Sequence, residues 1–222
     1  MAIAATLGYD DLPELLTRLT GDEKHDWSAL STLDVLWVLY DRVLRIDPAA
    51  PDDPDRDRFL LSKGHGPAAY YAVLAAKGFF PPEHLEGFGT FDSPLGYHPD
   101  RALIAGVEIS SGSLGHGLPI AVGVALAGRR VFCLVGDGEL DEGSNWEAVQ
   151  WAGRIGLGAL TAVVVDNHSS TYHWPGGIEE RFELEGWQAA RVDGRDHDAL
   201  EAALGSARAV DRPSCVVAEV RR

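Results

Sequence analysis

At 222 residues, of which 45% are hydrophobic and 24% charged, the chain is long and apolar enough for one α/β domain with its own core. Its formal net charge of −15 disfavours nucleic acid and anionic lipid as partners, because an acidic surface repels phosphates. We expect neither a membrane span nor a secretory signal, since the apolar runs are short and residues 1–9 carry no positive side chain. Cys133 and Cys215 lack the spacing of a zinc site or a disulfide framework, which favours free thiols in the reducing cytoplasm.

The first half of the chain predicts helices joined by long irregular segments. An amphipathic stretch at residues 12–19 is followed by a charged joint, and from Leu30 the apolar positions recur at helical spacing. A proline-rich loop at residues 48–57 ends that helix. Residues 59–62 are typical of a short buried strand, which runs into a glycine-rich turn at residues 63–67 and an Ala/Tyr-rich helix.

The second half of the chain predicts a regular alternation of strands and helices. It is preceded by two irregular segments, residues 87–99 and 109–117, and by a helix rich in Ala, Val and Gly. We expect strands at residues 131–135, 160–165, 188–192 and 214–220, and helices at residues 142–155 and 197–209. This pattern predicts an α/β fold with a mostly parallel sheet and helices on both faces.

Three small-residue turns, at residues 63–67, 110–117 and 136–145, are the candidates for a ligand site. In parallel sheets of this kind, ligands bind outside the carboxyl ends of the strands. We therefore expect the three turns to gather at that edge and to form one binding crevice.

The turn that begins at Gly136 has the features of a site for a diphosphate and a metal ion. Gly136 and Gly138 let the backbone approach an anion without a Cβ in the way. The helix that opens at about Glu139 presents unpaired N–H groups to phosphate oxygens. Asp137 would repel phosphate unless a hard cation such as Mg²⁺, which prefers oxygen ligands, lay between the two.

Further oxygen ligands for such a cation are expected at the end of the next strand. Asn167 lies one helix and one strand after Asp137, at the end of an apolar run. Its amide oxygen and the backbone carbonyl of Ser169 would complete the protein ligands of Mg²⁺, or of Ca²⁺ or Mn²⁺. Gly-Asp-Gly alone is usually an ordinary turn, but the strand-terminal Asn at this spacing makes the pattern much more specific.

Gly136-Asp137-Gly138 with Asn167 resembles the thiamine diphosphate signature, and the surrounding sequence resembles the transketolase family. The resemblance is carried further by the stretches DRFLLSKGHG, GVEISSGSLG and RFE followed by GW and DG, which occupy residues 57–66, 106–115 and 181–194. It covers almost the whole chain. It implies that residues 1–222 form a single thiamine diphosphate-binding domain of the kind that holds the diphosphate of the cofactor.

The resemblance also implies roles for individual residues. His65 would lie near the cofactor diphosphate and the substrate, and His98 would bind hydroxyl groups of a donor sugar. Glu142 would assist the cofactor-activating glutamate of a second domain across a subunit interface. The backbone atoms offered to the aminopyrimidine ring would come from Gly112, Ser113 and Leu114.

Two histidines stand at positions where the sequence departs from the family pattern. His25 aligns with the histidine of a Gly-His-Pro-Gly turn, but both glycines and the proline are replaced here. His116 occupies a place where the family usually has glutamine, and an imidazole with a pKa of about 6.5 can donate, accept or carry a proton there. Both are candidates for substrate contact, and the alternative for His116 is a neutral exchange.

In the transketolase family a pyrimidine-binding domain follows this one and supplies the activating glutamate, and the chain holds no strands to build it. We therefore expect a partner chain that carries that domain, in a heterotetramer with the cofactor between unlike chains. Candidate interface side chains are Trp27, Trp146, Trp151 and Trp174. The predicted reaction is transfer of a two-carbon ketol unit between sugars or related aldehydes. Acyloin condensation, 2-oxo acid decarboxylation and a noncatalytic scaffold role stay open as alternatives.

Overall fold

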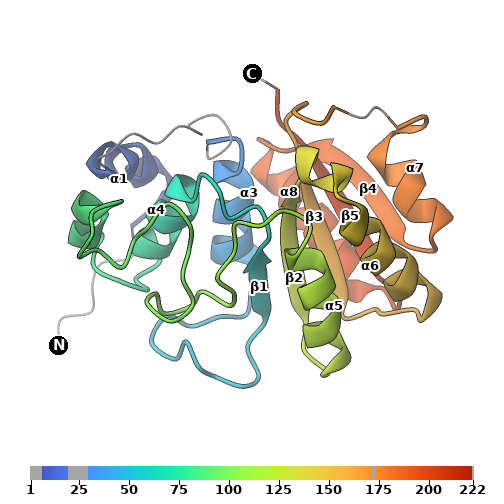
Figure 1. Ribbon diagram of the computed structural model, residues 1–222, viewed down its shortest axis with the longest axis horizontal. Helices are drawn as coiled ribbons and strands as arrows, with labels where there is room; N and C mark the ends of the chain where they lie inside the picture. The colour runs from blue at the N-terminus through green and yellow to red at the C-terminus, as the bar shows by residue number, and fades with distance from the viewer. Residues whose placement is uncertain (1–6, 20–29, 172–173, 222) are drawn as a thin grey trace.

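The computed structural model describes residues 7–19, 30–171 and 174–221, and a five-stranded parallel sheet stands at its centre (Figure 1). The strand order is β1-β2-β3-β5-β4, and every neighbouring pair runs parallel. The strands are β1 (Arg58–Leu61), β2 (Val131–Gly136), β3 (Leu160–Asp166), β4 (Gln188–Asp193) and β5 (Ser214–Glu219). Each lies within one residue of its predicted bounds, so the predicted α/β fold is confirmed.

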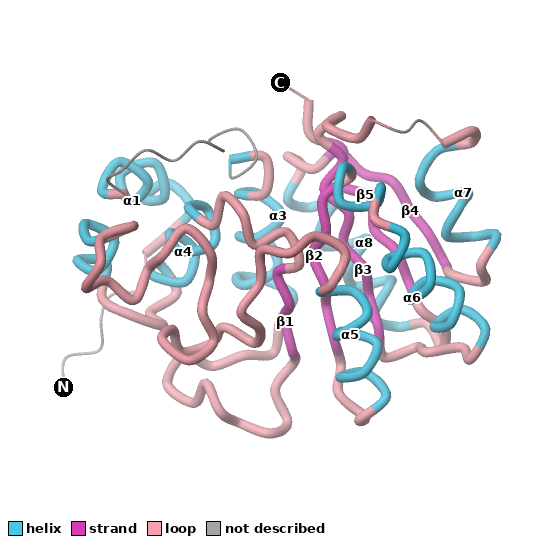
Figure 2. Tube along the Cα trace, in the orientation of Figure 1, coloured by secondary structure: helices cyan, strands magenta, loops and turns pink. Residues whose placement is uncertain are grey.

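Helices cover both faces of the sheet, as Figures 1 and 2 show. One face is covered by α1 (Leu12–Arg18), α3 (Leu33–Val38), α4 (Ala68–Ala76) and α8 (His197–Ala209). The other is covered by α5 (Gly117–Leu126), α6 (Gly143–Arg154) and α7 (Gly177–Leu184). The short helical turns are η1 (Tyr9–Asp11), η2 (Leu39–Val43), η3 (Pro82–Gly87) and η4 (Gly138–Asp141). Among the described helices, none is both long and apolar enough to cross a membrane.

The two cores take alternate side chains from the same strands. All residues of β2 and β3 are buried. Along β2, Phe132 and Leu134 face the core under α3, α4 and α8, whereas Val131, Cys133 and Val135 face the core under α5 and α6. This is the continuous apolar pattern of a strand that is covered on both sides.

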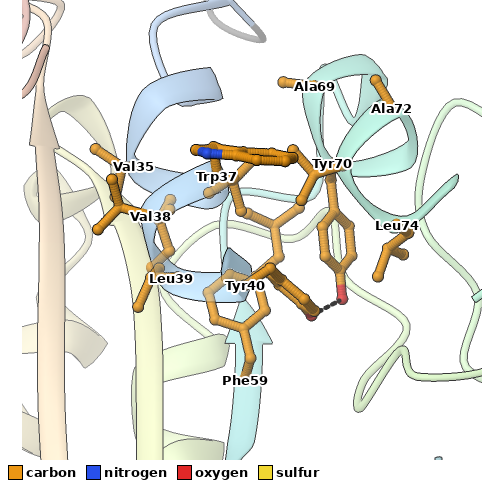
Figure 3. Packing of buried hydrophobic residues seen from close by; sticks show 14 of the residues in the cluster. Val35, Trp37, Val38, Leu39, Tyr40, Phe59, Ala69, Tyr70, Ala72 and Leu74 are labelled. Atoms are coloured by element: carbon orange, nitrogen blue, oxygen red, sulfur yellow. Dashed lines mark hydrogen bonds between the residues drawn. The ribbon is translucent and has the colours of Figure 1, made fainter. Parts of the chain in front are cut away.

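The first core is rich in aromatic rings, and it anchors the segment before the sheet (Figure 3). The hydroxyls of Tyr40 and Tyr70 lie 3.1 Å apart and form a buried hydrogen bond. The ring of Phe59, in β1, packs edge-on against Tyr40 with ring centroids 5.4 Å apart. Because these rings come from η2, β1 and α4, the start of β1 is fixed relative to the helices around it.

The carboxyl ends of β1, β2 and β3 meet at one edge of the sheet, because the three strands are parallel and adjacent. The segments that leave this edge are residues 62–67, 137–142 and 167–171. They hold half of the candidate site residues, among them Asp137 and Asn167.

Candidate functional site

The three predicted turns meet at the carboxylate of Glu139. One of its oxygens, Oε1, accepts hydrogen bonds from the backbone N–H of Gly115, at 2.9 Å, and from the hydroxyl of Ser62. The other, Oε2, accepts from the backbone N–H of Gly136 at 3.3 Å. The predicted gathering of the turns at one sheet edge is therefore confirmed, and Glu139 is the side chain that ties them together.

Two buried charges of opposite sign lie beneath this edge. Glu139 is 2% exposed, and burial raises the pKa of its carboxyl while its hydrogen-bond donors act in the opposite direction. Lys63 is 4% exposed, and burial lowers the pKa of its ammonium to about 8 against the opposing pull of Glu139 and Asp137. Sequence reasoning missed Lys63 as a site residue. The only signal for it was its place directly after β1, at the head of the glycine-rich turn.

Gly64 brings the turn after β1 into direct backbone contact with the second turn. A Cβ at this position would lie 2.5 Å from the carbonyl carbon of Ser111, closer than any real side chain approaches. Only glycine fits here, and the close approach of the two turns requires it. His65, the next residue, is half-buried on this turn.

The carboxylate of Asp137 fixes the loop that follows β3. It accepts hydrogen bonds from the backbone N–H of Ser169 at 2.6 Å, from the Ser169 hydroxyl at 2.7 Å and from the N–H of Ser170 at 2.9 Å. His168 has a φ of 59°, which is uncommon for a residue other than glycine. This left-handed turn aims the next two N–H groups at Asp137. Asp141 adds a second anchor, because it accepts from the Ser170 hydroxyl at 2.8 Å.

Among the described residues, only the nitrogen of the Asn167 side-chain amide has a hydrogen-bond partner. Its Nδ2 donates to the hydroxyl of Ser31 at 3.0 Å, and its Oδ1 is buried without a donor among the described residues. A buried polar oxygen without a partner is costly, so it calls for an explanation, such as a cation that the site is built to hold. The carbonyl of Ser169 lies 3.6 Å from where a Cβ on Gly138 would stand, on the same side of the β2 turn.

These residues fit a divalent metal that is bound together with a diphosphate. Within the described ranges, no cluster of three or more His, Cys, Asp or Glu side chains can hold a metal by itself. Asp137, the amide oxygen of Asn167 and the Ser169 carbonyl give too few ligands for the octahedral shell of Mg²⁺. Phosphate oxygens and water would have to supply the rest.

His98 reaches the second turn from a distant loop. A Cβ on Gly112 would lie 2.9 Å from Nε2 of His98 and would overlap its ring, so the imidazole rests directly on this glycine. The backbone of Gly112 has a φ of 150°. Ser113 is exposed and Leu114 is half-buried beside it. The structure thus brings a predicted substrate residue onto the predicted pyrimidine-binding turn.

His116 and Glu142 stand at the starts of two neighbouring helices. His116 precedes α5 and Glu142 precedes α6, and both side chains are exposed. A Cβ on Gly115, next to His116, would lie 2.7 Å from Cβ of Glu142. The Ser144 hydroxyl donates to the carbonyl of Gly115 at 2.7 Å and holds the two helix starts together.

Some of the remaining candidates lie elsewhere. His25 and Trp27 fall outside the described residues. Trp146 is 7% exposed and packs in the core against Phe182, whereas Trp151 is 46% exposed. Trp174 is half-buried against Trp146, with ring centroids 5.5 Å apart.

Comparison with known proteins agrees with this geometry. Residues 20–220 match the family described as transketolase, thiamine diphosphate binding domain. The chain is 37% identical to the 6-deoxy-6-sulfo-D-fructose transketolase subunit SqwG of Clostridium sp. (strain MSTE9), over 87% of this chain and 75% of that protein. Its fold matches the transketolase of Leishmania mexicana with a TM-score of 0.82 at 26% identity, over 96% of this chain and 37% of that one.

A third relative has a different name. The chain is 58% identical to the protein named Ferredoxin fas2 of Rhodococcoides fascians, over 96% of this chain and 72% of that protein. An iron–sulfur cluster of the ferredoxin kind needs four cysteine ligands. This chain has only Cys133 and Cys215, and both thiols are buried inside strands of the sheet. The chain therefore belongs to the transketolase family, as a member built around its thiamine diphosphate-binding domain.

Proposed function

We propose that this chain is the subunit of a two-component transketolase that holds the diphosphate of thiamine diphosphate through a divalent metal ion, with Mg²⁺ as the natural choice. The observation that carries the proposal is the meeting of Asp137, Asn167 and Ser169 at one sheet edge, with the buried Oδ1 of Asn167 left without a donor. A scaffold protein would have no need of Asp137 and Asn167 together at this edge.

In this proposal the residues around the edge divide the work of holding the diphosphate. Asp137, Oδ1 of Asn167 and the carbonyl of Ser169 bind the metal. Lys63 offers a buried positive charge beside Asp137, which offsets the negative charge of the phosphates. Glu139 keeps the three turns in register, because its oxygens accept hydrogen bonds from their N–H and O–H groups.

The substrate would be a sugar or a related aldehyde, from which a two-carbon ketol unit is moved. When bound, thiamine diphosphate supplies the electron sink for breaking a carbon–carbon bond next to a carbonyl. His98, exposed above Gly112, and His65, on the turn after β1, would donate hydrogen bonds to the hydroxyls of the donor. His116 would add a further polar contact at the start of α5.

The pyrimidine-binding domain and the activating glutamate would come from a partner chain, in a heterotetramer. The relative from Clostridium is itself named a transketolase subunit, which supports a two-chain arrangement. The exposed carboxylate of Glu142 is free to meet a partner at the start of α6. The helices α5 and α6, and the residue that follows α6, also expose apolar side chains that an interface would cover: Ile120, Leu126, Trp151 and Ile155.

Calorimetry tests the cofactor site directly. The full chain is titrated with thiamine diphosphate in the presence of Mg²⁺, with and without a co-expressed chain that carries a pyrimidine-binding domain. Asp137→Asn should abolish the Mg²⁺-dependent binding. Asp193→Asn, an exposed carboxylate at the end of β4, is the matched control and should bind as the unmodified chain does. Metal-dependent binding that survives Asp137→Asn would contradict the assignment.

The reaction is tested on the mixture of the two chains. Transfer of a ketol unit from a ketose donor to an aldehyde acceptor should need both chains, the cofactor and Mg²⁺. His98→Ala should raise the KM for the donor while thiamine diphosphate binding stays unchanged. Decarboxylation of a 2-oxo acid by the mixture, with no ketol transfer, would place the chain in a different reaction class.

A further inference from the structure

A large cavity lies at the edge of the sheet opposite to the candidate cofactor site. It has a volume of about 590 Å³ and opens between the starts of β1 and β2 and the end of α8. Two aspartates and five arginines line it, together with small residues: Asp55, Asp57, Arg45, Arg56, Arg129, Arg130 and Arg208, with Gly128, Gly205 and Ala209. Such a concentration of arginine stands out on a chain whose net charge is −15.

Some of these positive charges already have partners. Both terminal guanidinium nitrogens of Arg208 donate hydrogen bonds to the buried carboxylate of Asp57, at 2.7 and 3.1 Å. Arg56 pairs with Glu108, which lies outside the cavity. Arg129 is 3.8 Å from Asp55, whose side chain is 94% exposed, so this pair is a weak surface contact.

Arg45 and Arg130 are different, because neither forms an ion pair with a carboxylate among the described residues. Among the described residues, the side chain of Arg130 donates only to the backbone carbonyl of Gly158, at 2.7 Å. Burial lowers the pKa of Arg130, and the nearby positive charges of Arg208 and Arg45 lower it further against the opposing pull of the Asp57 carboxylate. Like charges held this close repel each other, and an anion in the cavity would relieve that repulsion.

Gly205 lines the cavity on the side of α8. It lies inside α8, where glycine is unfavourable relative to alanine because it loses more backbone freedom on folding. A Cβ at this position would meet nothing within 4 Å, so no packing contact requires glycine there. Because Gly205 lines the cavity, a larger side chain at this position would stand at its border.

The lining residues also indicate the chemical class of the ligand. No aromatic side chain is among the described residues that line the cavity, so they offer no platform on which a nucleotide base could stack. Its apolar residues are only glycine and alanine. Arginine is well suited to bind phosphate, because the paired N–H donors of its planar guanidinium can contact two phosphate oxygens at once.

We propose that this arginine-lined cavity binds a small phosphate-bearing molecule, such as an inorganic polyphosphate or a phosphate ester, between Arg45, Arg130 and the helix face at Gly205. The site is distinct from the cofactor edge. Arg130 directly precedes β2 and Asp137 directly follows it, and the six residues between them span about 20 Å at the usual rise per residue. Binding here does not depend on the proposed function.

The test is calorimetry of the full chain with inorganic triphosphate in the presence of a chelator, which silences metal-dependent binding at the cofactor edge. Arg45→Gln with Arg130→Gln should weaken the binding by about tenfold or more, because two charge-assisted contacts are lost. Gly205→Glu should weaken it as well, since it places a carboxylate at the cavity mouth while it favours the helix. Arg154→Gln, an exposed arginine at the end of α6, is the matched control and should leave the affinity unchanged.

Three results would overturn the proposal. The first is equal affinity for triphosphate in the unmodified chain and in the Arg45→Gln/Arg130→Gln variant. The second is a loss of triphosphate binding in Lys63→Gln but no loss in the arginine variants. This result would place the anion at the cofactor edge. The third is binding of an oligoglutamate peptide without binding of triphosphate, which would make the cavity a protein-docking site. Metal-dependent binding of thiamine diphosphate, measured separately, reports on the cofactor site alone.

Discussion

The Nδ2 group of Asn167 donates a hydrogen bond to the hydroxyl of Ser31 at 3.0 Å, and this contact determines what the other end of the amide can do. Ser31 is 1% exposed and lies just before α3, far from β3 in the sequence. Because the NH₂ group is engaged there, the oxygen is turned away from Ser31 and stays buried without a donor. Asn167 is thus held as an acceptor, which is the orientation that a metal ligand needs.

Asn167→Ala should separate ligand binding from stability. The metal-free chain should change its free energy of unfolding by less than about 1 kcal/mol, because the lost hydrogen bond is offset by removal of an unsatisfied oxygen. The affinity for thiamine diphosphate in the presence of Mg²⁺ should fall about tenfold or more, as it does when metal-site groups are removed. Urea unfolding and calorimetry measure the two effects.

Asn145 is the matched control for this substitution. It is also fully buried, its Nδ2 donates to the carbonyl of Glu139 at 2.7 Å, and its Oδ1 likewise has no donor. Asn145→Ala should leave the Mg²⁺ dependence of binding intact. If both variants lost the same affinity, the effect of Asn167 would come from packing and not from metal binding.

Glu139→Ala should destabilise the chain by about 2–4 kcal/mol, because the Ser62 hydroxyl and two backbone N–H groups would lose their buried acceptor. Glu139→Gln keeps one acceptor oxygen and should cost less. Glu147→Ala, an exposed glutamate on α6, should change the stability by less than about 0.5 kcal/mol. Chemical unfolding at neutral pH ranks the three variants, and an equal cost for Glu139→Ala and Glu147→Ala would contradict the role of Glu139.

The raised pKa of Glu139 predicts a pH dependence with a definite sign. The folded chain keeps the proton on this carboxyl to a higher pH than the unfolded chain, in which the pKa has its ordinary value of 4.5. The contribution of Glu139 to stability is therefore largest at low pH and decreases as pH rises above about 4.5. The difference in unfolding free energy between the unmodified chain and Glu139→Gln should shrink over that range. A difference that grows with pH would mean that the donors outweigh burial.

Local patterns made the sheet and the cofactor edge predictable. A run of buried apolar residues followed by Gly-Asp-Gly marks the end of β2 without reference to any other part of the chain. Once β2 and β3 are parallel neighbours, Asp137 and Asn167 must lie at the same edge. The positions of these two residues therefore follow from the sequence by geometry alone.

The contacts that complete the cofactor edge join residues far apart in the sequence, and no local sequence pattern predicts them. Ser62 reaches Glu139 across 77 positions of the sequence, and Ser31 reaches Asn167 across 136. The same holds for Lys63, whose burial beside Asp137 appears only when β1 and β2 are placed side by side.

The helix α7 was missed for a local reason. Its N-cap and its first residue are glycines with left-handed backbone angles, Gly176 and Gly177. A pair of glycines in the sequence predicts a turn. Only Ile178 and Phe182 are buried along it, so its apolar period is short and weak.

Arg181 should stabilise the packing of α7 through its contacts with two aromatic rings. The guanidinium carbon lies 3.7 Å from the ring centre of Trp146 and 3.6 Å from that of Trp174, and removal from water lowers the pKa of the group. Arg181→Gln should reduce the free energy of unfolding by about 1–3 kcal/mol, because two cation–π contacts and their packing are lost. Urea unfolding followed by tryptophan fluorescence measures this. A loss no larger than that of Arg154→Gln, at the exposed end of α6, would contradict the prediction.

Substitution by alanine should have opposite effects on stability at Gly205 and at Gly153. Both lie inside helices, α8 and α6. A Cβ on Gly205 meets nothing within 4 Å, so Gly205→Ala should stabilise the chain by about 0.5–1 kcal/mol through helix propensity. A Cβ on Gly153 would overlap the carbonyl oxygen of Glu185 and lie 2.9 Å from its carbon. Gly153→Ala should therefore destabilise the chain by about 1–3 kcal/mol, since the backbone next to α7 must move. Thermal unfolding of the two variants beside the unmodified chain gives both signs in one experiment. If Gly205→Ala were destabilising, the face of α8 in front of the arginines would be covered and not open.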